Sequence, residues 1–499
     1  MPASSRIGRR PSARIVVAAL ASCGIAVSLM QTIVMPLLPE FPRLLDTSAA
    51  NVTWLVTATL IAGAVCAPVL GRLGDMFGKR RMLLVALAVM TVGSALGAVS
   101  DEFAVVLVAR ALQGAAMGAI PLGISIMRDE LPPDEVGSGI ALMSATLGAG
   151  GAVGLPLTGV VAEHLSWHWL FGGSAVLGLF EIVVVWALVP ESPVRTGGRF
   201  DLVGALGLSG ALVCLLLAIT QGNGWGWTSG PVLGLFAAAA LLLGAWGRYE
   251  LRLSAGGRDH GAVGERTRQP LVDLWVSARP AVLLTNIASV LIGFAMFTSF
   301  MVSAQIFQAP TDTGYGHGLS LTLSGVALLP SGLMMIAFAP VSARLSRRHG
   351  PRTTFLLGAV FLAAGNLTRT LMPPQLTVLV VAIAVTAIGS AFAYGAIPAM
   401  IMSAVPVSET AAANSLNSLA RSLGTSSCSA VVAAVTTASV LQVAGAEFPT
   451  AGAYAAAFGI GTVAAVLALG VAVFVPPARD GAPDLPLSEI PGQRSGVAT

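Results

Sequence analysis

The run GRLGDMFGKRR, residues 71–81, is a glycine-rich, charged segment between two long apolar blocks. The blocks, Val52–Gly71 and Met82–Ser100, each have about the 20 residues that an α-helix needs to cross the hydrocarbon core of a bilayer. The glycines of the run permit a tight turn and a close approach of neighbouring helices. Asp75, in its centre, can accept hydrogen bonds from a helix N-terminus or from an arginine. The run therefore predicts a short, structured connection between two membrane-spanning helices.

The whole chain is strongly apolar, as these two blocks are. Of its 499 residues, 55% are hydrophobic and 10% are charged, and the mean hydropathy is +0.83, whereas roughly a quarter of the residues of a soluble domain are charged. No water-soluble fold could bury so much apolar surface, so we expect an all-α integral membrane protein. The apolar blocks predict about fourteen membrane-spanning helices, which are Ile15–Leu38, Val52–Gly71, Met82–Ser100, Phe103–Met127, Ser138–Ala162, Trp169–Val189, Leu202–Gln221, Pro231–Tyr249, Ala281–Phe307, Leu321–Ala343, Thr353–Leu371, Leu376–Met402, Thr410–Leu441 and Tyr454–Val475.

Basic residues indicate the orientation of these helices. They gather in the N-terminal segment and in the connections after the second, eighth and tenth predicted helices. Arg43 and Arg369 are predicted on the opposite side, and Arg110 and Arg421 within the membrane. Because loops rich in arginine and lysine face the cytoplasm, both termini are expected on the cytoplasmic side. The expected location of the protein is a bacterial plasma (inner) membrane. The net charge of +4 is small and lies in these connections, which argues against nucleic-acid binding.

Two segments of the chain are repeated. Gly71–Arg80 matches Ala343–Arg352 in spacing, and Gly118–Pro121 matches Gly395–Pro398, late in the fourth and twelfth predicted helices. Two related six-helix halves with two further helices between them explain both matches, and paired halves with a site between them are the architecture of alternating-access transporters. The predicted division of the chain is a basic N-terminal segment (1–14), an N-terminal six-helix bundle (15–190), two inserted helices (200–250), a cytoplasmic loop (251–279), a C-terminal six-helix bundle (280–475) and a disordered tail (476–499).

The run at 71–81 resembles the signature loop of the major facilitator superfamily, because the pattern Gly-x-Leu-x-Asp-x-x-Gly-Lys-Arg-Arg is complete. The helix count, Phe200–Ala205 and Gly224–Trp227 at the ends of the seventh helix, and Gln31–Val34 in the first helix are similar to the 14-spanner drug:proton antiporter branch. The resemblance covers residues 12–476. It implies two six-helix bundles, two peripheral added helices, a small-molecule substrate and proton coupling. It also implies a conformational-switch motif made of Gly71, Gly74, Asp75, Gly78, Lys79 and Arg80.

Arg110, Gln113 and Gly114 in the fourth helix resemble the Arg-x-x-Gln-Gly motif of the same family. Their spacing places the three side chains on one helix face. A buried arginine costs at least ~2.5 kcal/mol at the centre of a membrane helix, so Arg110 should face a polar interior and find a partner. A structural pairing role and a role in proton relay or substrate binding both stay open.

Small residues in the fifth helix resemble the antiporter motif of drug exporters. Gly150, Gly154, Pro156 and Gly159 would permit close packing against the partner bundle and a kink at the proline. The motif normally reads Gly-Pro-x-x-Gly-Gly, whereas here one residue intervenes before the proline and Thr158 replaces a glycine. Ordinary packing of small residues is the alternative interpretation.

Ionisable residues inside the predicted helices are candidates for coupling and substrate binding. The branch usually has an aspartate at the position of Met30, so its first-helix carboxylate is absent here. Glu181 is the one carboxylate well inside a predicted helix, and it is a candidate for proton exchange, as are Asp75 and Arg110; packing of Glu181 against a neighbour or a water is the alternative. Arg421 could bind an anionic substrate group or serve a structural pairing. Neutral candidates for the cavity wall are Gln31, Gln113, Asn286, Gln305 and Asn417.

The leading hypothesis from the sequence is a proton-driven exporter of small amphipathic or drug-like molecules, whose two bundles rock about a central cavity. An exporter of one metabolite, such as a self-made antibiotic, an amino acid or a sugar, is the alternative within this class. We expect a monomer in the lipid bilayer, without a cofactor; no Walker A pattern indicates ATP as the driver. Glu163, His164 and His168 are interpreted as boundary residues rather than a metal site. A membrane-embedded enzyme or a receptor is a remote alternative, because an enzyme would require clustered ionisable residues at one depth.

Overall fold

The computed structural model describes residues 12–34, 37–38, 40–196, 199–259, 270–406, 409–443 and 446–476. Most of the predicted basic N-terminal segment, part of the predicted loop at 251–279 and nearly all of the predicted disordered tail lie outside the described residues, so the expectations for them stay predictions.

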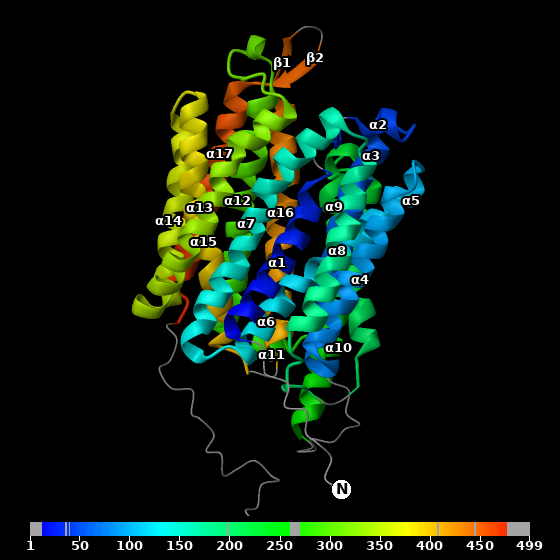
Figure 1. Ribbon diagram of the computed structural model, residues 1–499, viewed down its shortest axis with the longest axis vertical. Helices are drawn as coiled ribbons and strands as arrows, with labels where there is room; N and C mark the ends of the chain where they lie inside the picture. Colours follow the sequence, from blue (N-terminus) through cyan, green and yellow to red (C-terminus); the bar gives the residue numbers. More distant parts are fainter. Residues whose placement is uncertain are drawn as a thin grey trace, which may run out of the picture.

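The N-terminal half contains six long helical segments within the described residues (Figure 1). Its elements are α1 (Ala13–Thr32), α2 (Phe41–Leu44), α3 (Ala49–Phe77), α4 (Lys79–Ala98), α5 (Phe103–Ala115), the 3₁₀ turn η2 (Ala116–Gly118), α6 (Ala119–Glu130), α7 (Pro133–His164) and α8 (His168–Leu188). The segments α5, η2 and α6 together form the fourth long segment. Its 3₁₀ stretch comes just before Pro121, which lacks the N–H group that a continuous α-helix would use.

Two helices, α9 (Leu202–Trp225) and α10 (Gly230–Asp259), separate this half from the C-terminal half. The C-terminal half comprises α11 (Leu274–Ser277), α12 (Pro280–Gln308), the 3₁₀ turn η3 (Thr311–Thr313), α13 (Leu321–His349), α14 (Pro351–Leu371), α15 (Leu376–Met402), α16 (Thr410–Ala438), β1 (Val440–Val443), β2 (Ala446–Pro449) and α17 (Ala451–Val473). The strands form an antiparallel hairpin in which Val440 pairs with Pro449. In Figure 1, α13, α14 and α17 lie on the left, and α4, α8 and α10 on the right.

The lengths and surfaces of the helices fit a membrane. Thirteen helices of the described chain are long and apolar enough to span a bilayer. The long helix not among them, α16, has 29 residues but carries Asn414, Asn417 and Arg421. The prediction of an all-α membrane protein with about fourteen spans is confirmed. Large apolar side chains are exposed on the outside, for example Leu241 at 75% and Val176 at 70%, as expected of a surface that faces lipid rather than water.

The two halves meet through two equivalent helix pairs. α7 packs against α13, and α16 packs against α3. Since α3 and α13 are the second long segments of their halves and α7 and α16 the fifth, the same pairing occurs once in each direction, as a pseudo-two-fold axis requires. The equivalent connections α3–α4 and α13–α14 also turn at glycines with positive φ, Gly78 (119°) and Gly350 (83°), where a side chain would strain the backbone. The sequence repeat is therefore a structural repeat.

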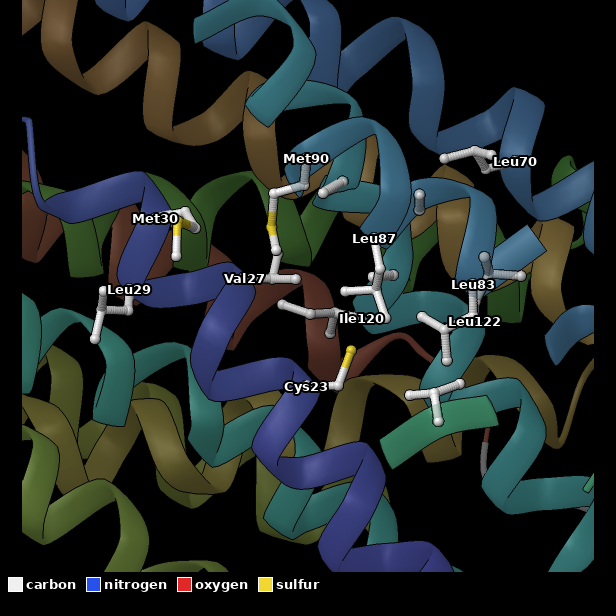
Figure 2. Close-up of a cluster of buried hydrophobic side chains, with 14 of the residues drawn as sticks. Cys23, Val27, Leu29, Met30, Leu70, Leu83, Leu87, Met90, Ile120 and Leu122 are labelled. Carbon is white, nitrogen blue, oxygen red and sulfur yellow. The ribbon is translucent and has the colours of Figure 1, made fainter. Parts of the chain in front are cut away.

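Each half has a hydrophobic core of its own. In the N-terminal half, Figure 2 shows α1 side chains such as Cys23 and Val27 beside Leu83 and Leu87 of α4, with Ile120 of α6 between the helices. Cys23, Leu83 and Leu87 are completely buried. A separate group in the C-terminal half joins α12, α14, α15 and α17. The first group also contains Met402 and Ala411 of the C-terminal half, so the two cores meet where the halves are in contact.

The inserted helix α9 packs against both α3 and α16. Leu208 and Leu216 of α9 share a buried group with Ala64 of α3 and Leu419 of α16. The helix α9 therefore covers the seam between the halves. α10 packs on α9 and leaves most of its span exposed.

Several predicted helix boundaries are wrong. α3 continues to Phe77, so Gly71 and Gly74 are helical and Gly78 alone makes the turn. α10 continues beyond its predicted end into the predicted loop, which also contains α11. The predicted thirteenth helix ends at Ala438, because β1 begins two residues later. In each case the apolar block marks the membrane depth rather than the end of the hydrogen-bonded helix.

Candidate functional site

The two halves enclose a central cavity of about 210 Å³. Its walls come from α1, α3, α5, η2, α6 and α7 in the N-terminal half and from α12, α13, α15 and α16 in the C-terminal half. One part of the wall is apolar, with Met296, Phe297 and Phe300, and another carries hydroxyl groups such as those of Ser299 and Thr386. A cavity with an apolar wall and a few polar groups suits a small amphipathic molecule.

Arg110 of α5 lines this cavity and is 2% exposed. Its Nη1 donates to the carbonyl oxygen of Met30 at 3.1 Å and to Oε1 of Gln113 at 2.6 Å. Gln113 in turn donates to Oγ of Ser94 at 2.9 Å. The Nε of Arg110 is buried without a hydrogen-bond partner. Among the described residues, no carboxylate forms an ion pair with this guanidinium, so neutral groups alone hold it in place.

Arg421 of α16 lines the cavity from the other half. Its Nη2 donates to Oγ of Ser418 at 3.1 Å, and its guanidinium lies 5.3 Å from the centre of the Tyr394 ring. The hydroxyl group of Tyr394, which also lines the cavity, has no hydrogen-bond partner. The Tyr394 hydroxyl group and the remaining guanidinium nitrogens of Arg421 therefore have no hydrogen-bond partner among the described residues.

Arg369 lies in the last turn of α14, at the end of this helix opposite to the α13–α14 connection, and is 4% exposed. Its Nη2 donates to Oγ of Ser299 at 2.6 Å and to Oγ1 of Thr386 at 2.7 Å, both in the cavity wall. The guanidinium also lies 4.6 Å from the centre of the Phe458 ring. The sequence did not predict that Arg369 is buried, because its partners lie on α12 and α15, far away in the chain. The spacing of Asn366 and Arg369 on one helix face was the available signal.

The small residues of α7 bring three helices together. A Cβ atom on Gly150 would lie 2.5 Å from the Ser28 side chain of α1, and one on Gly154 would lie 2.2 Å from the Thr32 side chain. At Gly159 the nearest atom, 2.6 Å away, belongs to the backbone of α13. Pro156 is similarly close to Gly325 of α13. The motif residues therefore lie where α7 contacts α1 and the opposite half.

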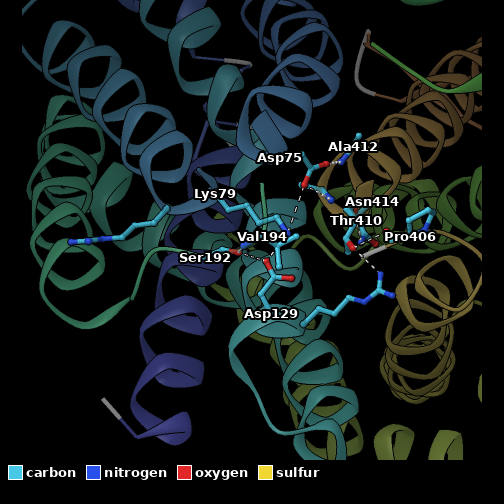
Figure 3. A network of polar contacts seen from close by, with 12 residues as sticks. Asp75, Lys79, Asp129, Ser192, Val194, Pro406, Thr410, Ala412 and Asn414 are labelled. Atoms are coloured by element: carbon cyan, nitrogen blue, oxygen red, sulfur yellow. Dashed lines mark hydrogen bonds and ion pairs between the residues drawn. The ribbon is translucent and has the colours of Figure 1, made fainter. Parts of the chain in front are cut away.

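Polar contacts join the two halves at one end of the molecule, the end with the α3–α4 and α13–α14 connections, which we name the basic end. Asp75 of α3 is completely buried and accepts hydrogen bonds from the backbone N–H groups of Ala411 at 3.3 Å and Ala412 at 2.9 Å (Figure 3). These two N–H groups belong to the first turn of α16, where a helix dipole favours a negative charge. Asp75 thereby joins the N-terminal half to the C-terminal half.

Lys79 compensates the charge of Asp75. Its Nζ lies 3.7 Å from Asp75 and 2.5 Å from Asp129 of α6, and all three side chains are inaccessible to solvent. Ser192, in the connection from α8 to α9, donates to the same Asp129 carboxylate at 2.5 Å. Arg80 donates from its backbone to Glu191. The run at 71–81 is thus bound to α6 and to the connection after α8.

Two further contacts surround the start of α16. Arg128 of α6 donates to Oγ1 of Thr410 at 2.7 Å and to the carbonyl oxygen of Met402 at 3.0 Å, so it also crosses between the halves. Glu409, just before α16, is near Asp273 and two arginines. Burial, followed by the negative charge of Asp273, raises the pKa of Glu409 above its ordinary value, although the arginines oppose this shift.

The remaining candidates lie in different places. Gln31 lines the main cavity, and Asn417 lines a smaller one of about 20 Å³ next to it, where Asn417 donates to Asn286 at 2.9 Å. Gln113, Asn286 and Gln305 are outside both walls. Glu181 of α8 is 1% exposed and accepts a hydrogen bond from Ser22 of α1 at 3.2 Å, away from the cavity lining.

The sequence did not reveal two other buried acids. Asp201 and Glu250 are 1% and 0% exposed. Asp201 accepts from the hydroxyl group of Tyr249 at 2.8 Å, and Glu250 accepts from the backbone of Leu271 at 3.1 Å. The first contact joins the start of α9 to α10, and the second joins α10 to the segment that leads into the C-terminal half. Glu250 is one residue beyond the end of its predicted helix, and an acid at such a position indicates a boundary residue that is exposed to solvent.

Of the residues considered as a boundary cluster, Glu163 and His164 are exposed. His168 lies 3.1 Å from Asp101 and stacks on Trp167. Among the described residues, no group of three or more histidine, cysteine, aspartate and glutamate side chains could hold a metal ion.

Paired six-helix halves around a central cavity define this chain as a membrane transport protein. A model of the Major Facilitator Superfamily matches residues 20–429 and 291–493, and the chain belongs to this family. The Tetracenomycin C resistance and export protein of Streptomyces glaucescens is 31% identical over 68% of this chain. The match spans only 60% of that relative's length. Multidrug resistance protein 3 of Bacillus subtilis (strain 168) is 24% identical over 74% of this chain and 69% of the relative.

Solved structures agree on the fold. The structure of the proton:xylose symporter XylE superposes with a TM-score of 0.63 and covers 93% of this chain and 96% of the symporter. The identity is 13%, so the likeness concerns the fold alone. The predicted resemblance is confirmed by the family match, by the fourteen long helical segments of the described residues and by relatives named for drug resistance and export.

Proposed function

We propose that this transporter exports small amphipathic or drug-like molecules in exchange for protons, with its basic end facing the cytoplasm of a bacterial plasma membrane. The observation that carries the proposal is the position of Asp75, a buried carboxylate of one half that binds the N-terminus of α16 in the other. It closes the basic end of a cavity whose wall is shared by both halves. The names of the relatives support export as the direction.

Alternating access follows from this arrangement. While the bonds from Asp75 and Arg128 to the C-terminal half are made, the cavity is closed toward the basic end. Breaking them would let the halves rock about the close contacts between α7 and α13, and the cavity would open to the cytoplasm. Few atoms would need to move within each half, because most of the buried apolar residues of each group belong to one half.

Proton exchange is assigned to Glu181. It is buried in a membrane helix and bound by one neutral hydroxyl group, without an ion pair among the described residues. An acid in such a place can bind and release a proton as its surroundings change. Its contact with α1, which also lines the cavity, would connect protonation to the position of that helix.

Transport in inside-out membrane vesicles tests the proposal. Vesicles with the protein should accumulate tetracenomycin C, or members of a panel of lipophilic drugs, when a proton gradient is imposed, and a protonophore should stop accumulation. Uptake that does not depend on the proton gradient would refute proton coupling. Transport of a single panel member would favour the metabolite-specific alternative.

Glu181→Gln should abolish the dependence of uptake on the proton gradient while downhill exchange of substrate continues. Glu163→Gln, which changes an exposed glutamate, is the matched control. If the pH dependence of Glu181→Gln equals that of the unaltered protein, the proton is carried elsewhere.

A further inference from the structure

All the charged side chains that line the central cavity within the described chain are positive, and this indicates the chemistry of its ligand. We propose that the cavity binds organic anions, that is, amphipathic molecules with an aromatic or aliphatic body and a carboxylate group. The proposal deepens the proposed function and rests on it, because it names the class of molecule that the exporter would carry.

Two arginines and no acids line the cavity. Arg110 and Arg421 contribute their guanidinium groups, and no aspartate or glutamate lines either the main cavity or the small one next to it within the described chain. Arginines buried in a membrane protein normally pair with acids or carbonyl groups. Here every partner found for the two guanidinium groups is neutral. An anion in the cavity would supply the missing countercharge, whereas a cation would be repelled.

The two arginines come from opposite halves, Arg110 from α5 and Arg421 from α16. In the described chain, Nη2 is the only nitrogen of the Arg421 guanidinium with a hydrogen-bond partner, so its other N–H groups can bind the two oxygens of a carboxylate. The Nε of Arg110 is also without a partner. A carboxylate between them would attract both halves at once.

A third arginine strengthens the positive charge from behind the wall. Arg369 holds the hydroxyl groups of Ser299 and Thr386, which line the cavity. The hydroxyl of Thr386 donates onward to the carbonyl oxygen of Ala382. The Ser299 hydroxyl accepts from Arg369 and has no acceptor for its own proton among the described residues, so it can donate that proton to an anion. The unpaired hydroxyl group of Tyr394 is a further donor.

The acidic side chains that were candidates for proton exchange have partners outside the cavity wall. Asp75 binds the start of α16 and Lys79. Glu181 binds Ser22 of α1, outside the cavity lining. At the α1 position nearest to Arg110 the chain has Met30, whose sulfur lies 3.9 Å from Oγ of Ser94 within the same polar group. A thioether there leaves Arg110 uncompensated.

The apolar wall completes the assignment. Met296, Phe297, Phe300 and Met335 line the same cavity as the arginines. They can bury a flat ring system by apolar contact and adapt through their flexible thioethers. The proposed ligand therefore has an apolar body beside its charged group and is not a small inorganic anion.

Three probes of one shape test the proposal on the purified full chain in detergent. Binding of radiolabelled 2-naphthoate, 2-naphthamide and 2-naphthylmethylamine is measured by equilibrium dialysis. We expect the carboxylate to bind at least about tenfold more tightly than the amide, and the amine to bind most weakly. Equal affinities, or tightest binding of the amine, would overturn the proposal without any mutation.

Variants then locate the charge. Arg421→Gln should weaken naphthoate binding about tenfold and leave naphthamide binding within about twofold, and Arg421→Lys should recover part of the loss. Arg252→Gln, which removes an exposed arginine of α10, is the matched control. If Arg421→Gln weakens all three probes equally while the protein stays monodisperse, Arg421 serves only the shape of the cavity and the proposal fails.

The transport assay separates this proposal from the proposed function. Proton-driven uptake of the amine but not of the carboxylate would keep the exporter and refute the anion site. Binding of the carboxylate that depends on Arg421, with no proton-driven uptake of any probe, would keep the anion site and refute the proton-coupled exporter.

Discussion

At the scale of single residues, charged side chains at the basic end join segments that lie far apart in the sequence, and Lys79 also pairs with Asp75 four residues away. Asp75 has two backbone N–H groups of α16 and one ammonium group around it. Such charge-assisted hydrogen bonds are shorter and stronger than neutral ones. A change of one atom in Asp75 should therefore alter how often this end opens.

Asp75→Asn should reduce transport at least about tenfold while the protein is still expressed. The amide keeps one acceptor oxygen but lacks the charge that binds both the helix start and Lys79, and each such bond contributes about 1.5–3 kcal/mol. Opening can be followed by maleimide labelling of Ser415→Cys, buried beside Gly71, in inside-out vesicles after replacement of the four native cysteines. Faster labelling is expected, and normal transport would remove Asp75 from the mechanism.

Lys79→Met should shorten the half-life of the protein at elevated temperature. The variant leaves the carboxylates of Asp75 and Asp129 buried without their shared ammonium group, and breaking a buried ion pair costs about 3–5 kcal/mol. The matched variant Arg81→Met removes a side chain that is 66% exposed and paired at 3.8 Å, so it should cost no more than about 1 kcal/mol. Equal half-lives of the two variants would contradict this interpretation of the cluster.

At the scale of helices, α7 and α13 touch backbone to backbone. A Cβ atom on Gly325 would lie 2.5 Å from the backbone nitrogen of Pro156, and one on Gly332 would lie 2.9 Å from the carbonyl oxygen of Gly148. Neither neighbour can move aside as a side chain could. The absence of side chains at these glycines therefore sets the distance between the helices about which the halves would rock.

Gly325→Ala should force α7 and α13 apart, lower thermal stability and slow transport. Gly173→Ala in α8 is the matched control, because no heavy atom lies within 4 Å of its new Cβ atom. Fluorescence-detected gel filtration after heating measures the stability of both variants. A Gly325→Ala protein as stable and active as Gly173→Ala would show that the contact tolerates separation.

The helices could be predicted from the sequence far better than the contacts among them. Hydropathy blocks of the right length indicate spans, and glycines with charges indicate turns, because both signals are local. The burial of Arg369 and Glu250 was not predicted for the opposite reason: their partners, Ser299 and Leu271, lie far away in the sequence. The cavity is likewise a product of packing, and only part of its wall, such as Gln31 and Arg421, could be named beforehand.

At the scale of the whole molecule, three kinds of contact hold the halves together. The pairs α3–α16 and α7–α13 form most of the interface, α9 covers the seam beside the first pair, and polar bonds join the halves at the basic end. The helix contacts are extended apolar surfaces, whereas the polar bonds are individual hydrogen bonds and ion pairs. The polar bonds can therefore break without exposing a large apolar area. Movement that opens the cavity is therefore expected at the basic end, with the long helix pairs as the pivot.

A reversible cross-link across the basic end should stop transport by holding this end closed. Arg128 and Thr410 contact one another across the two halves, so Arg128→Cys and Thr410→Cys, in a chain without the native cysteines, can be joined by a short bifunctional thiol reagent with a disulfide in its spacer. Uptake into inside-out vesicles should fall to background after cross-linking and return to the level of the untreated double variant after reduction. Each single variant, treated in the same way, controls for modification alone. Full activity of the cross-linked protein would mean that substrate passes without opening this end, and rocking of the two halves would no longer explain transport.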